Sequence, residues 1–359
     1  PIFAPNETEK ALAESYRAAA ANLPGADDDG LASLRQRAMT RFEATGLPHR
    51  RIEEWRYTEL RRHLAKLPQA GEAAQISASE VAENPLHSAF AGLKPHWLVF
   101  IDGAYAPSLS GGPALPEGVE VRALSDGMVP GWARDEITAR AAGDIDSVFD
   151  LNTALMADGA LIRVEKGVDA GVPLAIVHLG HGGVRHMRHV VVVEDGATLS
   201  LIEAYGSIGD GAELATAAVN WRIGDDAALD HVKVQLASEN ATHLATQISE
   251  IGANTRASSF TLTLGASFSR EQRHVRIGGE DSTVSVSGTY LLGGRQHGDT
   301  TLVVTHAAPG CESRERFKGL VDDAARGVFQ GSVIVERDAQ KTDARQSVDA
   351  LLLSDDARH

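Results

Sequence analysis

A short turn motif recurs four times in the second half of the chain and constrains its fold more than any other feature. Each copy has an apolar residue, a small or acidic turn, and then the start of a new strand-like run. The copies begin at Val193, Ile223, Ile251 and Ile277, so their spacings are 30, 28 and 26 residues, with room for two strands in each interval. Self-similarity at this period in a strand-rich region predicts a solenoid, because each repeat buries its apolar face against the next.

The segments around these turns are rich in strand signals. Short β-branched runs recur from residue 160 to residue 336, and no long helical pattern interrupts them. Several runs alternate strictly, as LDHVKV does at 229–234, which predicts one inward and one outward face. A β-sandwich would have unrelated strands without the recurring turn. We therefore expect a mainly β core over residues 159–359, built as a flattened parallel β-helix of two packed sheets.

The first 158 residues have a different pattern. Apolar residues at three- and four-residue spacing predict two helices, and the acidic run 27–29 can cap the second. A third helix is expected over 52–67, ended by Pro68, so that residues 1–90 form a helical region and linker. Residues 91–158 predict a mixed connecting region, with a strand near 97–103 and a helix near 134–157. The apolar positions of the first two helices are Leu12, Tyr16, Ala19, Leu31, Leu34, Ala38 and Phe42.

Charge and composition exclude several classes of function. The formal net charge is −15, which repels phosphate backbones, so we expect no nucleic-acid partner. A single cysteine allows no intrachain disulfide and no multi-cysteine zinc site. Neither a signal peptide nor an apolar run long enough to span a bilayer is visible, so we expect a cytoplasmic protein with no membrane partner. Because the chain starts at Pro1 and stops soon after the apolar run LLLS, we expect the natural protein to continue.

The one cysteine, Cys311, follows His306 by five residues in the stretch HAAPGC. A thiolate beside an imidazole can act as a nucleophile or bind a soft metal ion. Alternatively, Cys311 is a small buried residue and His306 belongs to an ordinary turn, because Pro309 and Gly310 make the intervening segment a loop. We name Cys311 and His306 as the candidate metal ligands and keep both interpretations open.

Four further histidines, His178, His181, His186 and His189, surround a glycine-rich turn. Imidazoles gathered at a turn can bind a transition metal. However, His186 and His189 lie three residues apart, on opposite faces of a strand, and strand reversal explains the glycines. The pattern favours a structural role.

No residue pattern indicates catalysis. The chain lacks a phosphate-binding P-loop, the zinc-protease pair of histidines, the serine-hydrolase elbow and a dinucleotide glycine fingerprint. The segment PHRRIEEWRYTEL (48–60) mixes cations, acids and aromatic residues, which is typical of an amphipathic helix and would also suit a docking surface. We therefore expect no enzyme activity.

Three long segments together resemble the SufB/SufD family of the Suf iron–sulfur cluster assembly machinery, in particular its SufD branch. The segment PHRRIEEWRYTELRRHL (48–64) is similar to an N-terminal element of that branch. FDLNTALMADGALIRVEKGV (149–168) resembles the start of the family's β-helix. The stretch 306–357, with SR, F-x-G and AQKTDARQ in order, resembles the signature block of the core. The resemblance covers almost the whole chain.

The resemblance implies a right-handed parallel β-helix after an N-terminal helical region. It implies a scaffold subunit that pairs with SufB through the β-helix, docks the ATPase SufC, and supports complex integrity and the step at which iron enters. It implies no stably bound cofactor, with iron or a nascent iron–sulfur cluster held only transiently at the SufB interface. The family's C-terminal helical segment and its Cys/His pair lie beyond His359 and are absent from this sequence.

Two other functions compete with this interpretation. A β-helix enzyme acting on carbohydrate would need aromatic platforms and clustered acids, whereas aromatic residues make up only 5% of the chain. A homo-oligomeric interaction protein, such as a homodimer in isolation, remains the other alternative.

Overall fold

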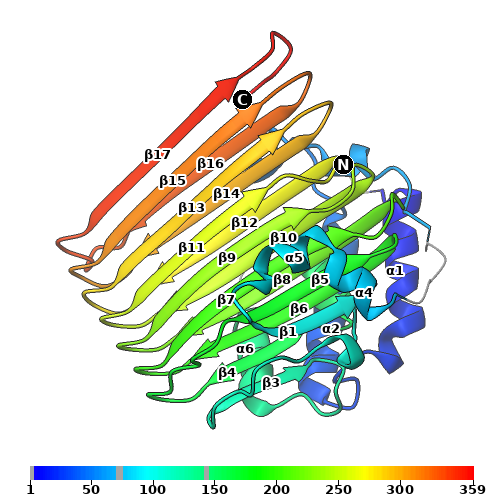
Figure 1. Ribbon diagram of the computed structural model, residues 1–359. Helices are drawn as coiled ribbons and strands as arrows, with labels where there is room; N and C mark the ends of the chain where they lie inside the picture. The colour runs from blue at the N-terminus through cyan, green and yellow to red at the C-terminus, as the bar shows by residue number, and fades with distance from the viewer. Residues whose placement is uncertain (1–3, 70–75, 141–144) are drawn as a thin grey trace.

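The computed structural model describes residues 4–69, 76–140 and 145–359. Helices occupy the N-terminal part and a long β-solenoid the rest, so the chain is mainly β, as predicted (Figure 1). None of the described helices is long and apolar enough to cross a membrane.

The first two predicted helices are confirmed, and their caps explain where they begin. Helix α1 (Glu7–Ala19) starts at Asn6, whose side chain accepts from the Glu9 amide while the Glu9 carboxylate accepts from the Asn6 amide. Helix α2 (Asp29–Thr45) starts at Asp28, whose carboxylate accepts from the amides of the next turn. Six of the seven apolar positions of these helices are buried, and Ala19 packs against them.

Two predicted helices are wrong. The segment 52–67 contains only a 3₁₀ turn, η2 (Glu53–Trp55), and the four-residue helix α3 (Leu60–His63). Trp55 is buried under the guanidinium of Arg270, which donates to the Glu54 carbonyl at 2.9 Å. These contacts hold residues 52–67 in an irregular conformation against the solenoid. We call this segment the strap.

The helix expected near 134–157 is instead two helices, α6 (Gly131–Arg140) and α7 (Ser147–Leu155). Asp146 has extended backbone and caps α7 by accepting from the Phe149 amide at 2.8 Å. An acidic residue before an apolar run is therefore a helix start here, and not part of a continuous helix.

The other elements of the N-terminal half are short. They are η1 (Ala20–Asn22), α4 (Ala78–Glu83), α5 (Pro85–Ala91), β1 (His96–Ile101), β2 (Ala104–Tyr105), η3 (Pro107–Leu109) and β3 (Val119–Ala123). Strand β1 matches the strand expected near 97–103.

The solenoid consists of two sheets whose strands alternate along the chain. One sheet has nine strands in the order β17-β15-β13-β11-β9-β7-β5-β1-β2, and the other has eight in the order β16-β14-β12-β10-β8-β6-β4-β3. Strands β4 to β17 pair in parallel with one another within each sheet, and β5 also pairs in parallel with β1, whereas β2 and β3 pair antiparallel with β1 and β4. The predicted flattened parallel solenoid is confirmed. The bounds are β4 (Ala160–Val164), β5 (Leu174–Gly180), β6 (Gly183–Val193), β7 (Thr198–Ser207), β8 (Glu213–Ile223), β9 (Ala228–Leu236), β10 (Ala241–Ile251), β11 (Arg256–Thr263), β12 (Phe268–Ile277), β13 (Thr283–Leu292), β14 (His297–His306), β15 (Glu312–Val321), β16 (Arg326–Val335) and β17 (Asp343–Leu352).

The recurring turns of the sequence stack on one another in the structure, so that their first residues form a column. Val193, Ile223, Ile251 and Ile277 end four successive strands and lie in register. The turn after each one contains a residue with positive φ, a conformation that glycine, asparagine and aspartate adopt most readily. These residues are Gly196 (φ 67), Asp226 (φ 56), Asn254 (φ 52) and Asp281 (φ 56).

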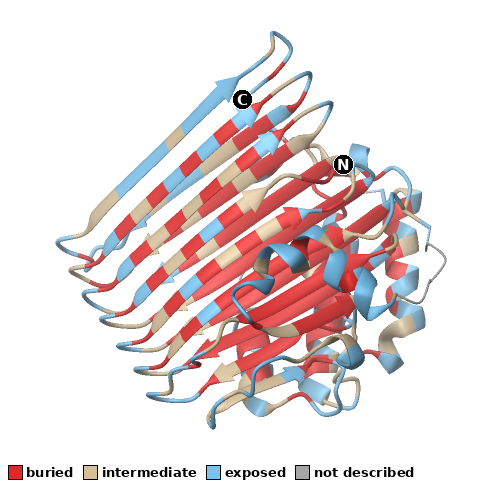
Figure 2. Ribbon diagram, in the orientation of Figure 1, coloured by how far each residue is buried: buried red, intermediate tan, exposed pale blue. Residues whose placement is uncertain are grey.

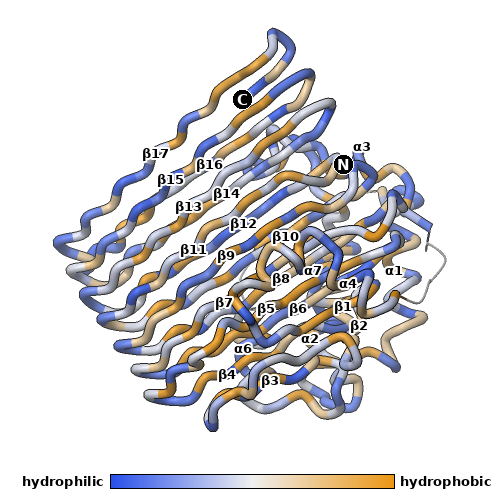
Figure 3. Tube along the Cα trace, viewed as in Figure 1, coloured by the Kyte–Doolittle hydropathy of each residue, from blue (hydrophilic) through white to orange (hydrophobic). Residues whose placement is uncertain are grey.

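Helices cover only part of the solenoid. Residues of α1, α2, α6 and α7 pack on the outer face of the eight-stranded sheet, against side chains such as Leu161, Leu214 and Leu244. Helices α4 and α5 contribute Val81 and Leu86 to a cluster on the other sheet. Burial decreases toward β16 and β17 (Figure 2), and apolar and polar residues alternate along the strands (Figure 3).

Candidate functional site in the solenoid interior

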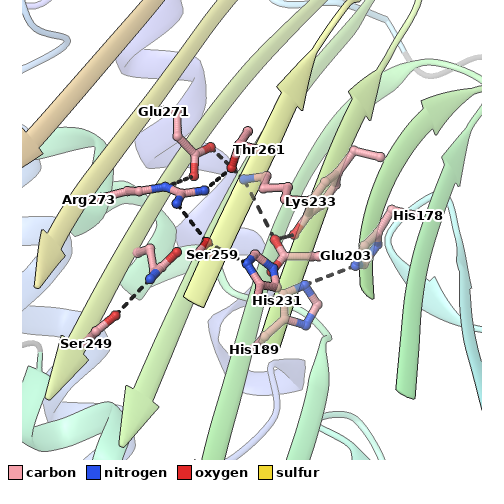
Figure 4. A network of polar contacts seen from close by, with 12 residues as sticks. His178, His189, Glu203, His231, Lys233, Ser249, Ser259, Thr261, Glu271 and Arg273 are labelled. Atoms are coloured by element: carbon pink, nitrogen blue, oxygen red, sulfur yellow. Dashed lines mark hydrogen bonds and ion pairs between the residues drawn. The ribbon is translucent and has the colours of Figure 1, made fainter. Parts of the chain in front are cut away.

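A band of polar side chains crosses the interior of the solenoid, between the two sheets. One end of the interior is apolar, with stacked residues such as Val191, Trp221 and Val275. Farther along the strands, the inward positions carry ionisable and hydroxyl groups, all of them buried (Figure 4). We call this set the interior network. Its members are His178, His189, Glu203, Tyr205, His231, Lys233, Ser259, Thr261, Glu271 and Arg273.

Parallel register brings the charged members together. Glu203 of β7, Lys233 of β9 and Thr261 of β11 are direct neighbours on adjacent strands. The Lys233 Nζ lies 2.6 Å from Glu271 Oε2 and 3.7 Å from Glu203 Oε1, so one ammonium bridges two carboxylates. Arg273 binds the other oxygen of Glu271 at 3.1 Å. Two cations thus balance two anions, as a buried cluster requires.

Hydroxyl groups complete this arrangement. Tyr205 donates to Glu203 Oε1 at 2.6 Å, and Arg273 Nη1 donates to Ser259 Oγ at 2.9 Å. Burial is the largest single effect on Glu203 and raises its pKa, but the charge of Lys233 together with the neighbouring His231 and His189 outweighs burial and holds the pKa well below its usual value. The same competition lowers the pKa of Glu271. Both carboxylates are therefore ionised at neutral pH.

The hydrogen bonds assign the proton positions of His189 and His231 in their neutral form. His189 Nδ1 accepts from the Ala160 amide at 2.8 Å, so its proton is on Nε2 and is donated to His178 Nε2 at 3.0 Å. The Ser259 hydroxyl accepts from Arg273 and donates to His231 Nδ1 at 2.9 Å. The His231 proton is then on Nε2, 3.5 Å from Glu203 Oε2.

Burial keeps these imidazoles neutral. It lowers the pKa of His189 to about 4 and that of His243, next to the network, to about 3. Because His189 already uses Nδ1 as an acceptor, binding a metal ion through Nε2 would require loss of the ring's proton. The His178–His189 pair is therefore arranged as a hydrogen bond.

The structure separates the four clustered histidines of the sequence. His178 and His189 meet in the interior, whereas His186 bonds Thr216 Oγ1 at 2.8 Å on the helix-covered side. His181 bonds Asp102 Oδ2 at 2.8 Å in the turn between strands. The prediction that His186 and His189 lie on opposite faces is confirmed. Within the ranges that the structure describes, no group of three or more His, Cys, Asp or Glu residues could hold a metal ion.

Cys311 is buried and occupies a recurrent turn position. Its Sγ donates to the Gly279 carbonyl at 3.1 Å and approaches the Pro309 carbonyl at 3.5 Å. The hydroxyls of Ser282, one turn earlier, and Thr255, two turns earlier, occupy equivalent positions. Each makes the same pair of contacts, to a carbonyl about one turn back and to a carbonyl two residues back. The thiol thus has a structural role that a hydroxyl performs elsewhere.

His306 takes the next place in the column of Val193 and Ile277. Its Nε2 bonds Ser313 Oγ at 2.9 Å, and its buried Nδ1 has no hydrogen-bond partner in the described residues. No contact joins His306 to Cys311 among the described interactions. Their proposed role as metal ligands stays a prediction.

The interior network was missed by the sequence reasoning, although a signal exists. In LDHVKV (229–234), His231 and Lys233 share the inward phase of Leu229, while the valines point outward. Polar residues in phase with a core leucine identify an interior network once the phase of the strand is known.

The outer edges of β16 and β17 have no neighbouring strand in the described part of the chain. Exposed apolar side chains gather there, including Ile334, Val335 and Leu351. Unpaired strand edges can add a strand from another chain.

Comparison with known proteins assigns the family. Residues 177–359 match the family profile described as the SUF system FeS cluster assembly, SufBD core domain, and residues 6–176 match the SufBD protein N-terminal region. The SufBD family protein slr0076 of Synechocystis is 27% identical over 353 residues, covering 94% of this chain and 77% of the relative. The SufD protein of Escherichia coli is 26% identical over 324 residues, covering 89% of this chain and 73% of the relative. The chain therefore belongs to the SufBD family of iron–sulfur cluster assembly proteins.

Proposed function

We propose that this chain is a SufD-like scaffold subunit that pairs with SufB through the solenoid and binds the ATPase SufC. In this role it maintains the complex and supports the step at which iron enters, and it is not itself an enzyme. The observation that carries the proposal is that family matches span both the helical region and the solenoid. The structure adds a long parallel sheet pair whose last strands have open edges among the described residues.

The open edge of β17 supports pairing by strand addition. The amides of Asp343 and Leu353 donate to Cys311 and Val321 of the β15 side. Because N–H directions alternate along a strand, the amides of even-numbered residues such as Ala350 point away from β15. They are available to a strand of SufB.

We also propose that no cofactor is bound stably. Iron or a nascent cluster is the cargo, held transiently at the SufB interface, and Cys311 and His306 are the candidate ligands within this chain. The free Nδ1 of His306 supports this proposal, whereas the hydrogen bonds of Cys311 favour a structural role for the thiol.

Co-purification tests the pairing. The affinity-tagged protein is co-expressed with SufB and SufC and is expected to retain both. Ala350→Pro removes one amide that faces the open edge and should reduce the recovered SufB several-fold, whereas Ala350→Ser keeps that amide and should recover normal amounts. The proposal is wrong if neither partner is retained by the unmodified protein. Unchanged recovery with Ala350→Pro would reject the β17 edge as the contact.

A further inference from the structure

A pocket rich in arginine is formed by residues of the strap and of the segment just before it, away from the interior network. It has a volume of about 360 Å³ and is lined by His49, Arg50, Arg51, Glu59 and Arg61. This volume is within the range of small-molecule sites. Three guanidinium groups outnumber the carboxylates of Glu59 and of Glu9, which pairs with Arg61, so the pocket keeps an excess of positive charge although the whole chain carries a net charge of −15.

One of the three cations is fixed in place. Arg61 Nε and Nη2 lie 3.0 and 3.2 Å from the two carboxylate oxygens of Glu9. Glu9 is buried and also accepts from the amides of Asn6 and Leu47 at 2.7 and 2.9 Å. These amides stabilise the ionised Glu9, and Arg61, which also donates to the Ala4 carbonyl at 2.6 Å, is held in place at the pocket wall.

The other two cations are available to a ligand. Arg50 Nε lies 3.8 Å from Glu59 Oε2, beyond hydrogen-bond distance, and the Arg50 side chain is 78% exposed. Arg51 is exposed and makes no ion pair with any described residue. Exposed ion pairs of this length contribute little, so an anion can replace Glu59 as the partner of Arg50 at small cost.

Backbone contacts hold the lining residues in one arrangement. The Ile52 amide donates to the His49 carbonyl at 2.9 Å, and the Arg61 amide donates to the Pro48 carbonyl at 3.0 Å. The Arg51 amide donates to His49 Nδ1 at 3.2 Å, so neutral His49 carries its proton on Nε2 and offers a further donor. These hydrogen bonds hold the turn at residues 48–52 against helix α3, which carries Arg61.

We propose that this pocket binds a compact polyanion whose paired oxygens match the guanidinium fork, as those of linked phosphates or of several carboxylates do. The binding groups are Arg50, Arg51 and Arg61, with Glu59 as the competing internal anion. A small ligand fits better than a long anionic chain. The cations line one concave pocket, and the net charge of the protein repels an extended polyanion.

Isothermal titration of the protein with pyrophosphate and with citrate, at 0.15 M salt, tests this site. Binding of either probe is expected, and the probe that binds more tightly identifies the phosphate or carboxylate source. Arg51→Gln should weaken binding at least tenfold. Glu59→Gln, which removes the competing carboxylate, should strengthen it several-fold, a change that a purely structural role would not produce.

Arg37→Gln is the matched control, because Arg37 is an exposed arginine of α2 that does not line the pocket and makes no ion pair with a described residue. It should leave the affinity unchanged. The proposal is overturned if neither probe binds at millimolar concentration, if Arg37→Gln weakens binding as much as Arg51→Gln, or if an acidic peptide binds while both small anions do not. Circular dichroism of each variant separates lost binding from lost folding.

Discussion

At the scale of single residues, Cys311 is best explained as one member of a repeated turn. Thr255 and Ser282 use a hydroxyl where Cys311 uses its thiol. We therefore expect Cys311→Ser to change the free energy of unfolding by less than about 1 kcal/mol, the scale of one hydrogen bond. Urea unfolding measures this. A folded Cys311→Ser protein that no longer supports cluster assembly with SufB and SufC would instead establish a role in metal or sulfur chemistry.

Lys233 is the residue on which the interior network depends most. Its ammonium contacts Glu203 and Glu271, so Lys233→Met leaves two buried carboxylates without their shared cation. We expect a loss of ~3–5 kcal/mol in the free energy of unfolding, the usual cost of breaking a buried pair. Adding Glu203→Gln to that variant should recover part of the loss.

The exposed pair of Lys166 and Asp195, 3.3 Å apart, supplies the control for that measurement. Lys166→Met should cost much less than Lys233→Met, because surface pairs are screened by water and salt. Equal losses for Lys166→Met and Lys233→Met would show that the interior charges contribute no more than surface charges do.

At the scale of elements, the strap shows why a helical pattern failed. Residues 52–67 have helix-forming composition, but their side chains and carbonyls bind the solenoid. Thr58 bonds Asp299 and, at 3.0 Å, His297, while His63 bonds Thr242 at 3.0 Å. Propensity is a weak preference, and contacts with residues far away in the sequence override it. No local pattern contains that information.

Removing one such contact should destabilise the protein measurably. Thr58→Val keeps the shape of the side chain but removes one of the hydrogen bonds donated to the buried Asp299 carboxylate. We expect a loss of about 1–3 kcal/mol in the free energy of unfolding, from urea denaturation. Thr45→Val, at an exposed position of α2, should cost within about 0.5 kcal/mol. If the two losses are equal, the strap contributes nothing beyond its local structure.

The solenoid elements were predictable because their signal is local and repeated. The column of Val193, Ile223, Ile251 and Ile277 is visible as a period in the sequence, and the same period fixes the register. The candidate site was not predictable in the same way. Lys233 and Glu271 come from different sheets and are 38 residues apart, and only the packing of one sheet on the other joins them.

At the scale of the whole molecule, neutral imidazoles are spread through the fold, in the interior network and outside it. Most of the chain's 14 histidines have a lowered pKa, with burial as the first cause. A folded-state pKa below the unfolded value means that the unfolded chain binds more protons as the pH falls. The contribution of these histidines to the free energy of unfolding is therefore fully present above about pH 6.5 and is lost as the pH falls toward 4.

Two buried acids and one half-buried acid act in the opposite direction. Burial raises the pKa of Asp146, Glu213 and Glu315, so the folded state holds their protons more tightly, and they lose stabilising effect as the pH rises. They are fewer than the histidines with a lowered pKa. The balance therefore predicts a protein that loses stability on acidification from pH 7.5 to 5.0.

His189 allows this prediction to be tested at one position. A pKa near 4 in the folded state, against about 6.5 when unfolded, gives a loss of about 2 kcal/mol between pH 7.5 and 5.0. His189→Gln can still accept from the Ala160 amide and donate to His178, but it does not titrate. Its free energy of unfolding should therefore fall less than that of the unmodified protein over the same interval, by about that amount. Identical pH dependence in urea unfolding of the two proteins would mean that His189 gains no proton on unfolding. The interpretation of His178 and His189 as a neutral, hydrogen-bonded pair would then be wrong.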